Sequence, residues 1–124
     1  MFTLSRESTI DNLRAIVAGL TLRLFTDDVE PDSAFTLADL TEASGGGYAP
    51  IALNPLLWEE APHKRLAYPK QRFTFTGPVA GGVVHGYYLT RDGKMFGAER
   101  FREPWQVQVP GSWGEVSLML GEKP

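Results

Sequence analysis

The fold is decided by the stretch from Val83 to Phe101, which reads VVHGYYLTRDGKMFGAERF. Two runs rich in aromatic and β-branched residues flank the dipeptide Asp92-Gly93, which is typical of the two-residue turn of a β-hairpin. The stretch therefore predicts a long antiparallel ribbon. Such a ribbon is not stable alone in water, so we expect further strands to cover its apolar face.

The register of this hairpin is left open by the sequence. A two-residue turn pairs Leu89 with Phe96, whereas a three-residue loop with Gly93 in the left-handed conformation opposes Tyr88 to Phe96. A slip of one residue moves every side chain to the other face of the ribbon. Both faces carry apolar residues, so the pattern does not choose between the two.

The length of 124 residues fits one domain with a single core. Thirteen glycines and nine prolines in so short a chain indicate many turns, as in mainly β proteins. We expect a single domain over residues 1–124, with an N-terminal arm and helix over 1–20 and a β-sandwich over 21–124.

One helix is predicted, from Ser8 to Leu20. Ile10, Leu13, Val17 and Leu20 recur at the spacing of one helical face. We expect this helix to lie across one end of the β domain or to contact a neighbouring subunit.

Alternating apolar and polar residues predict short strands over residues 20–26, 48–53, 70–76, 105–109 and 116–120. In residues 70–76, Phe73 and Phe75 are expected to point inward. Residues 35–41 fit either a strand or one helical turn, and residues 54–69, with three prolines and no period, predict a long surface loop. With the hairpin, the count is seven to eight short strands, which favours an antiparallel β-sandwich or jelly-roll.

Charge and composition disfavour several classes of protein. The net charge is −3 with acids and bases mixed along the chain, whereas nucleic-acid binders carry a basic patch. No apolar run approaches the roughly 18–20 residues that span a bilayer. The chain has no cysteine, which excludes disulfides, thiolate metal sites and cysteine nucleophiles. We therefore expect neither a nucleic-acid nor a membrane partner.

Residue patterns of catalytic or metal sites are scarce. His63 and His85 have no further ligand at metal-binding spacing. The adjacent carboxylates of Glu59-Glu60 do not suit a glycosidase, whose two carboxyl groups face each other across a cleft. Residues 28–39 mimic the acidic spacing of a calcium loop, but Ser33 stands where that loop needs glycine. The sequence thus predicts no enzyme, no metal and no cofactor.

Trp58 and Tyr68 fall in the predicted loop rather than on a strand. Exposed aromatic residues often anchor protein interfaces or stack against sugars. Of these two roles, the sequence favours a protein contact over a glycan.

Several sequence phrases, in a fixed order, resemble small virion structural proteins of tailed bacteriophages. They are LRLF at 22–25, LADLTEA at 37–43, GYAP at 47–50, FTFTG at 73–77, GYYLT at 86–90 and AERF at 98–101, followed by Pro104. The resemblance runs from about Leu20 to the C-terminus, and residues 54–68 are its least familiar part. It implies a β-sandwich capsid cement, or decoration, protein without a cofactor.

The same resemblance implies partners and a location. Cement proteins brace major capsid subunits on the capsid surface, often as homotrimers, and are made in the host cytoplasm. We expect contacts from the N-terminal helix and from the loop over 54–69, with a polar rim around apolar anchors. The expected interface residues are Ile10 and Leu13 of the helix, Leu56, Leu57, Trp58 and Tyr68 as anchors, and Lys64 and Arg65 as the rim.

Two other readings remain open. One is a tail or baseplate structural protein, which would be present in far fewer copies per particle than a cement protein. The other is a β-sandwich module that binds glycan.

Overall fold

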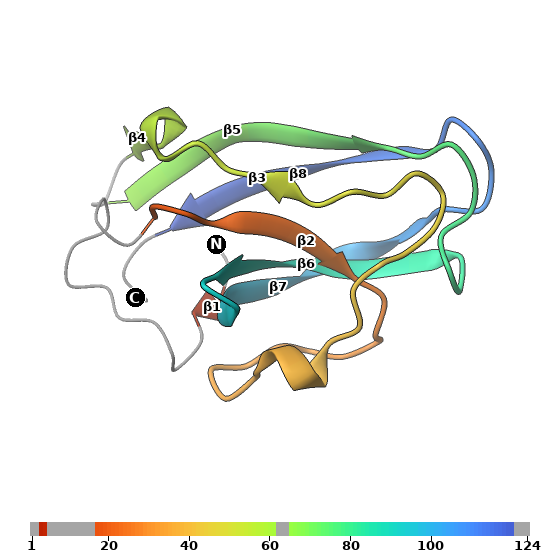
Figure 1. Ribbon diagram of the computed structural model, residues 1–124, viewed down its shortest axis with the longest axis horizontal. Helices are drawn as coiled ribbons and strands as arrows, with labels where there is room; N and C mark the ends of the chain where they lie inside the picture. Colours follow the sequence, from red (N-terminus) through yellow and green to blue (C-terminus); the bar gives the residue numbers. More distant parts are fainter. Residues whose placement is uncertain (1–2, 5–16, 62–64, 121–124) are drawn as a thin grey trace.

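The protein is a sandwich of two antiparallel sheets in a computed structural model, which describes residues 3–4, 17–61 and 65–120 (Figure 1). This confirms the predicted mainly β fold. The larger sheet has the strand order β1-β7-β6-β2-β3 and the smaller one β4-β5-β8. The strands are β1 (Thr3–Leu4), β2 (Thr21–Phe25), β3 (Ile51–Ala52), β4 (Glu59–Ala61), β5 (Arg65–Thr74), β6 (Val83–Arg91), β7 (Lys94–Gln106) and β8 (Trp113–Leu120), with 3₁₀ turns η1 (Leu37–Asp39) and η2 (Pro55–Leu57).

The predicted hairpin is formed by β6 and β7. Arg91 lies opposite Lys94, so the turn has the two residues Asp92 and Gly93. Their φ angles are 52° and 75°, as the tight turn of a right-twisted hairpin requires. Of the two alternatives, the two-residue turn is therefore the correct one.

The pairing beyond the turn differs from both predicted registers. An irregularity between Leu89 and Thr90 places Leu89 opposite Gly97 rather than Phe96, and a second one between Val84 and Gly86 places Val84 opposite Trp105. Each of these β-bulges adds residues to β7 that have no partner on β6. Bulges leave no sequence signal as clear as Asp-Gly, which is why the prediction failed here.

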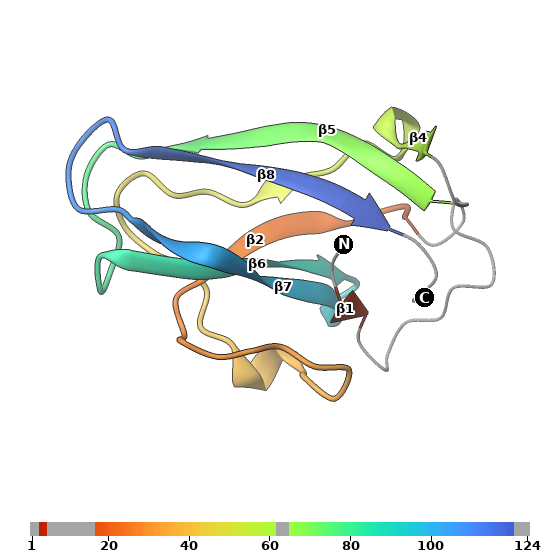
Figure 2. The ribbon, with the colours of Figure 1, turned by 180° about the vertical axis from the view of Figure 1, so that it is seen from behind.

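The main core lies between the two sheets. Alternate residues of β5 and β8 point into it, and both predicted inward residues, Phe73 and Phe75, are buried. Figure 2 shows β5 and β8 above β2, β6 and β7 from behind. The larger buried residues include Leu22, Leu24, Trp58, Tyr68, Phe73, Phe75, Tyr87, Leu89, Phe96, Leu118 and Leu120.

A second, smaller core covers the outer face of the larger sheet. Phe25, Tyr88, Met95 and Ala98 form it, and Val29, Leu37 and Leu40 pack against it. The last three belong to residues 26–42, which leave the sheet after β2, pass through η1 and return (Figure 1). We call this segment the cover segment. Its two ends are joined by the hydrogen bond Thr26 N to Thr41 O (3.0 Å), and the residue that follows it is joined to β2 by Ala43 N to Leu24 O (2.9 Å).

The predicted helix is not found in the part that the structure describes. Residues 8–16 lie outside the described ranges, and Val17–Gly19 form a turn before β2. The helix therefore does not reach Leu20. For residues 35–41, the helical alternative is the right one, since they contain η1.

The predicted surface loop over residues 54–69 is wrong. This segment contains η2, β4 and the first half of β5. Pro69 lies inside β5, where the pairing with β8 shifts between Tyr68 and Gln71. A β-bulge lets a strand accommodate proline, which has no N–H to donate. In the sequence, the three prolines and the lack of a period over residues 54–69 hide this strand.

We expect Gly86→Ala to destabilise the fold strongly. A Cβ atom at this position would lie 2.3 Å from the Glu99 carbonyl oxygen and 2.4 Å from two ring carbons of Phe25. Overpacking of this kind costs about 3 kcal/mol of unfolding free energy, measurable by urea denaturation. Gly77→Ala is the matched control, because its Cβ would meet no atom within 4 Å. Equal stability of the two variants would contradict this account of Gly86.

Candidate functional site

The residues considered for chemistry from sequence have structural partners. His85 lies 2.9 Å through Nδ1 from the Thr26 carbonyl oxygen and donates a hydrogen bond to it. His63 lies outside the described residues. Glu59 and Glu60 follow each other on β4, where successive side chains point to opposite faces. They therefore form no carboxylate pair.

The acidic residues of the calcium-like spacing do not converge on a shared site. Asp28 pairs with Arg100, whose hydrogen bond and positive charge lower the pKa of that carboxyl. Asp32 accepts a hydrogen bond from Ala34 N at 2.8 Å, and Asp39 accepts one from Thr36 N at 2.8 Å. Within the described ranges, no group of three or more histidine, cysteine or acidic residues is placed to hold a metal ion. No helix there is long and apolar enough to cross a membrane.

Among the large apolar side chains of the described ranges, the most exposed is that of Leu56, on η2. Leu56 is 86% exposed and its neighbour Leu57 is 45% exposed. We call Pro55–Leu57 the leucine turn. Two adjacent exposed leucines at one point of the surface are a candidate contact site, because water is released when a partner covers them.

The leucine turn is fixed by hydrogen bonds to Asn54 and by the buried rings of Trp58 and Tyr68. Asn54 caps it, since its Oδ1 accepts from Leu56 N at 3.0 Å and its carbonyl oxygen accepts from Leu57 N at 3.0 Å. Asn54 N in turn donates to the Tyr68 hydroxyl at 2.8 Å. The Trp58 ring meets the Tyr68 ring edge-on, with centroids 5.1 Å apart. The leucines are therefore presented on a backbone that is fixed to the core.

Of the predicted interface residues, only some have the expected position. Trp58 and Tyr68 are buried in the main core, so the expectation that they are exposed anchors is wrong, and they instead support the leucine turn. Arg65 is half-buried at the start of β5, with Nη1 3.6 Å from Met119 Sδ. Lys64 lies outside the described residues, as do Ile10 and Leu13.

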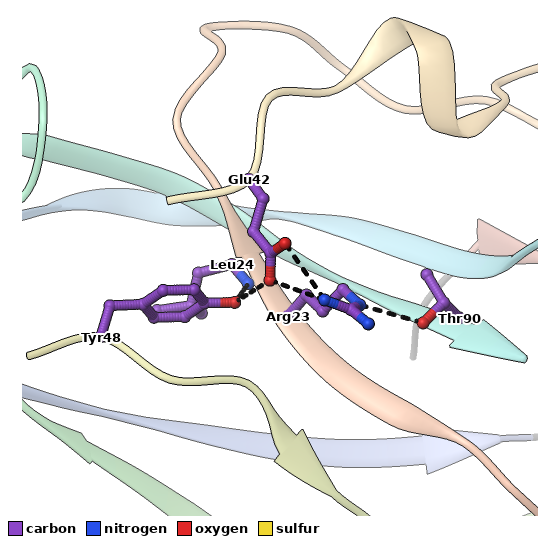
Figure 3. A network of polar contacts seen from close by, with 5 residues as sticks. All are labelled: Arg23, Leu24, Glu42, Tyr48 and Thr90. Atoms are coloured by element: carbon purple, nitrogen blue, oxygen red, sulfur yellow. Dashed lines mark hydrogen bonds and ion pairs between the residues drawn. The ribbon is translucent and has the colours of Figure 1, made fainter. Parts of the chain in front are cut away.

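A polar network that the sequence did not predict joins β2, the cover segment and β6 (Figure 3). Arg23 donates from Nε to the Thr90 hydroxyl at 3.1 Å and from Nη1 to the two Glu42 carboxylate oxygens at 3.1 and 2.9 Å. The Tyr48 hydroxyl donates to Glu42 at 2.7 Å and accepts from Leu24 N at 3.1 Å. The network thus pins the end of the cover segment to the larger sheet.

A polar hollow of about 210 Å³ lies beside this network. It is lined by Arg23, Leu37, Glu42, Tyr88, Thr90 and Gly93. The charges of Arg23 and Glu42 cancel at its wall, and neither residue is more than about a third exposed. We assign the network a structural role, because its hydrogen bonds link chain segments to one another.

Three of the four tyrosines have raised pKa values. Burial raises the pKa of Tyr48, and the hydrogen bond to Glu42 raises it further. Burial is also the first cause for Tyr87, whose hydroxyl lies 3.1 Å from Glu99 Oε1. Burial, with the negative charge of Glu42, raises the pKa of Tyr88 to about 12. These side chains stay neutral in the folded protein at pH values where an unfolded chain ionises.

No protein-family model, curated protein or solved structure matches this chain. In the geometry described above, the leucine turn is the candidate contact site, because it exposes two adjacent leucines.

The raised tyrosine pKa values predict alkaline unfolding. Below pH 10, the ordinary tyrosine pKa, the folded and unfolded states bind these protons equally, and stability is unaffected. Above pH 10 the unfolded chain releases protons that the folded protein keeps, so stability falls. Each such tyrosine contributes up to about 1.4 kcal/mol per pH unit.

Tyr88→Phe tests this linkage. We expect urea denaturation between pH 10 and 12 to show a shallower fall of unfolding free energy in the variant than in the wild type. If the variant and the wild type lose unfolding free energy equally between pH 10 and 12, Tyr88 ionises equally in the folded and unfolded states, and the prediction is contradicted. Measurements at pH 7 give the baseline, because the hydroxyl is neutral there in both states.

Proposed function

We propose that this chain is a non-enzymatic structural protein of a tailed-phage virion, a capsid cement protein that docks on the major capsid protein. The observation that carries the docking role is the leucine turn, with Leu56 86% exposed on a backbone fixed by Asn54 and Tyr68. The phage assignment is supported by the order of the sequence phrases.

A fixed apolar projection suits docking on energetic grounds. Ordering a flexible loop on binding costs free energy, and a preformed turn avoids most of that cost. Two leucines are a small anchor, so a single contact is weak. On a capsid lattice, many linked copies of a weak contact hold as one assembly.

The surroundings of the leucine turn indicate the chemistry of its partner. Glu59 is exposed on β4, two residues after the end of the leucine turn. A partner surface with an apolar pocket and basic groups at its rim would complement both features. We propose such a surface on the major capsid protein.

The sandwich itself suits a bracing role. Its larger sheet is covered on both faces, by the smaller sheet and by the cover segment. Close packing on both faces makes a sheet resist deformation, because packed interiors have low compressibility. A rigid body that joins neighbouring subunits transmits load between them.

The double variant Leu56→Ser/Leu57→Ser tests the docking role. We expect binding to capsids that lack this protein to weaken about 30-fold, which corresponds to about 2 kcal/mol for an anchor pair. Occupancy can be measured by co-sedimentation with the particles. Both side chains are exposed, so the fold should be retained.

Val109→Ser is the matched control, since Val109 is 61% exposed and belongs to the loop over residues 107–112 between β7 and β8. Figure 1 shows this loop at the opposite end of the sandwich from β4, which directly follows η2. Binding by Val109→Ser should equal that of the wild type. Wild-type binding by the double variant would refute docking through the leucine turn. Equal heat resistance of particles with and without the protein would refute the bracing role.

A further inference from the structure

Four strands lie at the edges of the two sheets in the described ranges, and β8 is much longer than the other three, β1, β3 and β4. β1 and β3 have two residues each and β4 has three, whereas β8 has eight. Short edge strands protect a protein against pairing with another chain, and so do proline and lysine on a long edge. β8 reads WGEVSLML and carries neither.

The backbone of β8 has one edge without a strand partner in the described ranges. β8 pairs only with β5 there. Phe75 N donates to Ser112 O at 2.8 Å, so the carbonyl group of Ser112 faces the chain of β5, whereas Ser112 N donates to Val109 O within the preceding turn. Because peptide groups alternate in direction along a strand, those of Trp113 and of every second residue after it face away.

We propose that a second copy of this chain pairs with this edge, β8 antiparallel to β8, to make a symmetric dimer with one continuous six-stranded sheet. The smaller sheets of the two copies would join in the order β4-β5-β8-β8-β5-β4. This association requires no capsid, and it is independent of docking through the leucine turn.

One register of the β8–β8 pair forms the most hydrogen bonds with the N–H and C=O groups that face away from β5. With Val116 opposite Val116 of the second copy, Trp113 lies opposite Met119 and Glu115 opposite Ser117. All four are residues whose N–H and C=O groups face outward, so each pair exchanges two hydrogen bonds. The overlap then covers the whole strand.

The side chains agree with this register. Trp113 is exposed, with the Arg72 guanidinium 3.9 Å from its ring centroid, and Met119 opposite would give it a sulfur–aromatic contact. Glu115 can accept a hydrogen bond from Ser117. A shift of the centre to residue 115 would instead place Glu115 opposite Glu115, where like charges repel.

The symmetry of this contact limits the assembly. The same surface patch is used on both copies, so the contact closes as a dimer. A homotrimer, which the phage resemblance implies, would need a different, head-to-tail contact.

Cysteine cross-linking tests both the contact and its register, because the chain itself has no cysteine. Cα atoms of a hydrogen-bonded antiparallel pair lie about 5.5 Å apart, within the range of a disulfide. We mix equal amounts of full-length Glu115→Cys and Ser117→Cys under mild oxidation. The mixed disulfide should form at least about tenfold faster than either homodimer. A faster homodimer, or no cross-linking above the rate of Gly77→Cys, would overturn the proposal.

Ser117→Pro provides the equilibrium test. It removes an outward N–H without breaking a bond to β5. In sedimentation velocity over a concentration series, the wild type and Ser117→Thr should dimerise. The dissociation constant of Ser117→Pro should be at least about tenfold higher, from two lost hydrogen bonds per dimer. A wild type that stays monomeric at every concentration would also overturn the proposal.

Discussion

Burial of β6 on both faces is the constraint on which the rest of the structure depends. Residues Gly86 to Thr90 are buried without a break, so both sides of the larger sheet need cover. The smaller sheet covers one side and the cover segment the other. Phe25 at the end of β2 crosses directly over Gly86. A side chain at Gly86 would displace that ring, and with it the start of the second core.

The polar network holds this second core in place. Val29, Leu37 and Leu40 offer the cover segment only a small apolar area. Glu42 adds hydrogen bonds from Arg23 and Tyr48 at the point where the segment returns to the sheet. These polar groups satisfy one another, so their partial burial does not leave a charge or a hydroxyl without a partner.

Four of the six sequence phrases quoted above meet in that network. LRLF supplies Arg23, LADLTEA supplies Glu42, GYAP supplies Tyr48 and GYYLT supplies Thr90. These four phrases therefore share a structural role, the attachment of the cover segment to the sheet. The leucine turn lies outside these phrases, so the polar network and the proposed contact surface are carried by different parts of the chain.

The sequence predicts those parts of the fold that depend on local rules. Asp92-Gly93 identifies the hairpin, and alternation identifies Phe73 and Phe75 as core residues. It does not predict that β5 begins at Arg65, because Pro69 interrupts the pattern and only the pairing with β8 shows a bulge there.

Nor does the sequence predict the candidate site fully. Leu56 and Leu57 were expected at the surface and are exposed. The sequence predicts Trp58 and Tyr68 beside them, but long-range packing in the main core buries both. The partners of Arg23 lie 19 and 67 residues away in the chain, and no local pattern encodes such a meeting.

Three edge strands of the described sandwich are short and one, β8, is long. This difference limits how far pairing between strands of different copies can extend. A sheet with two open sides can recruit neighbours indefinitely and grow into a fibre. In the described ranges this sandwich offers one long unpaired edge, so a strand that pairs with it leaves no second long edge on which the sheet can extend. Pairing of two copies at that edge, as proposed above, would therefore end at the dimer and would not grow into a fibre, even where many copies stand close together.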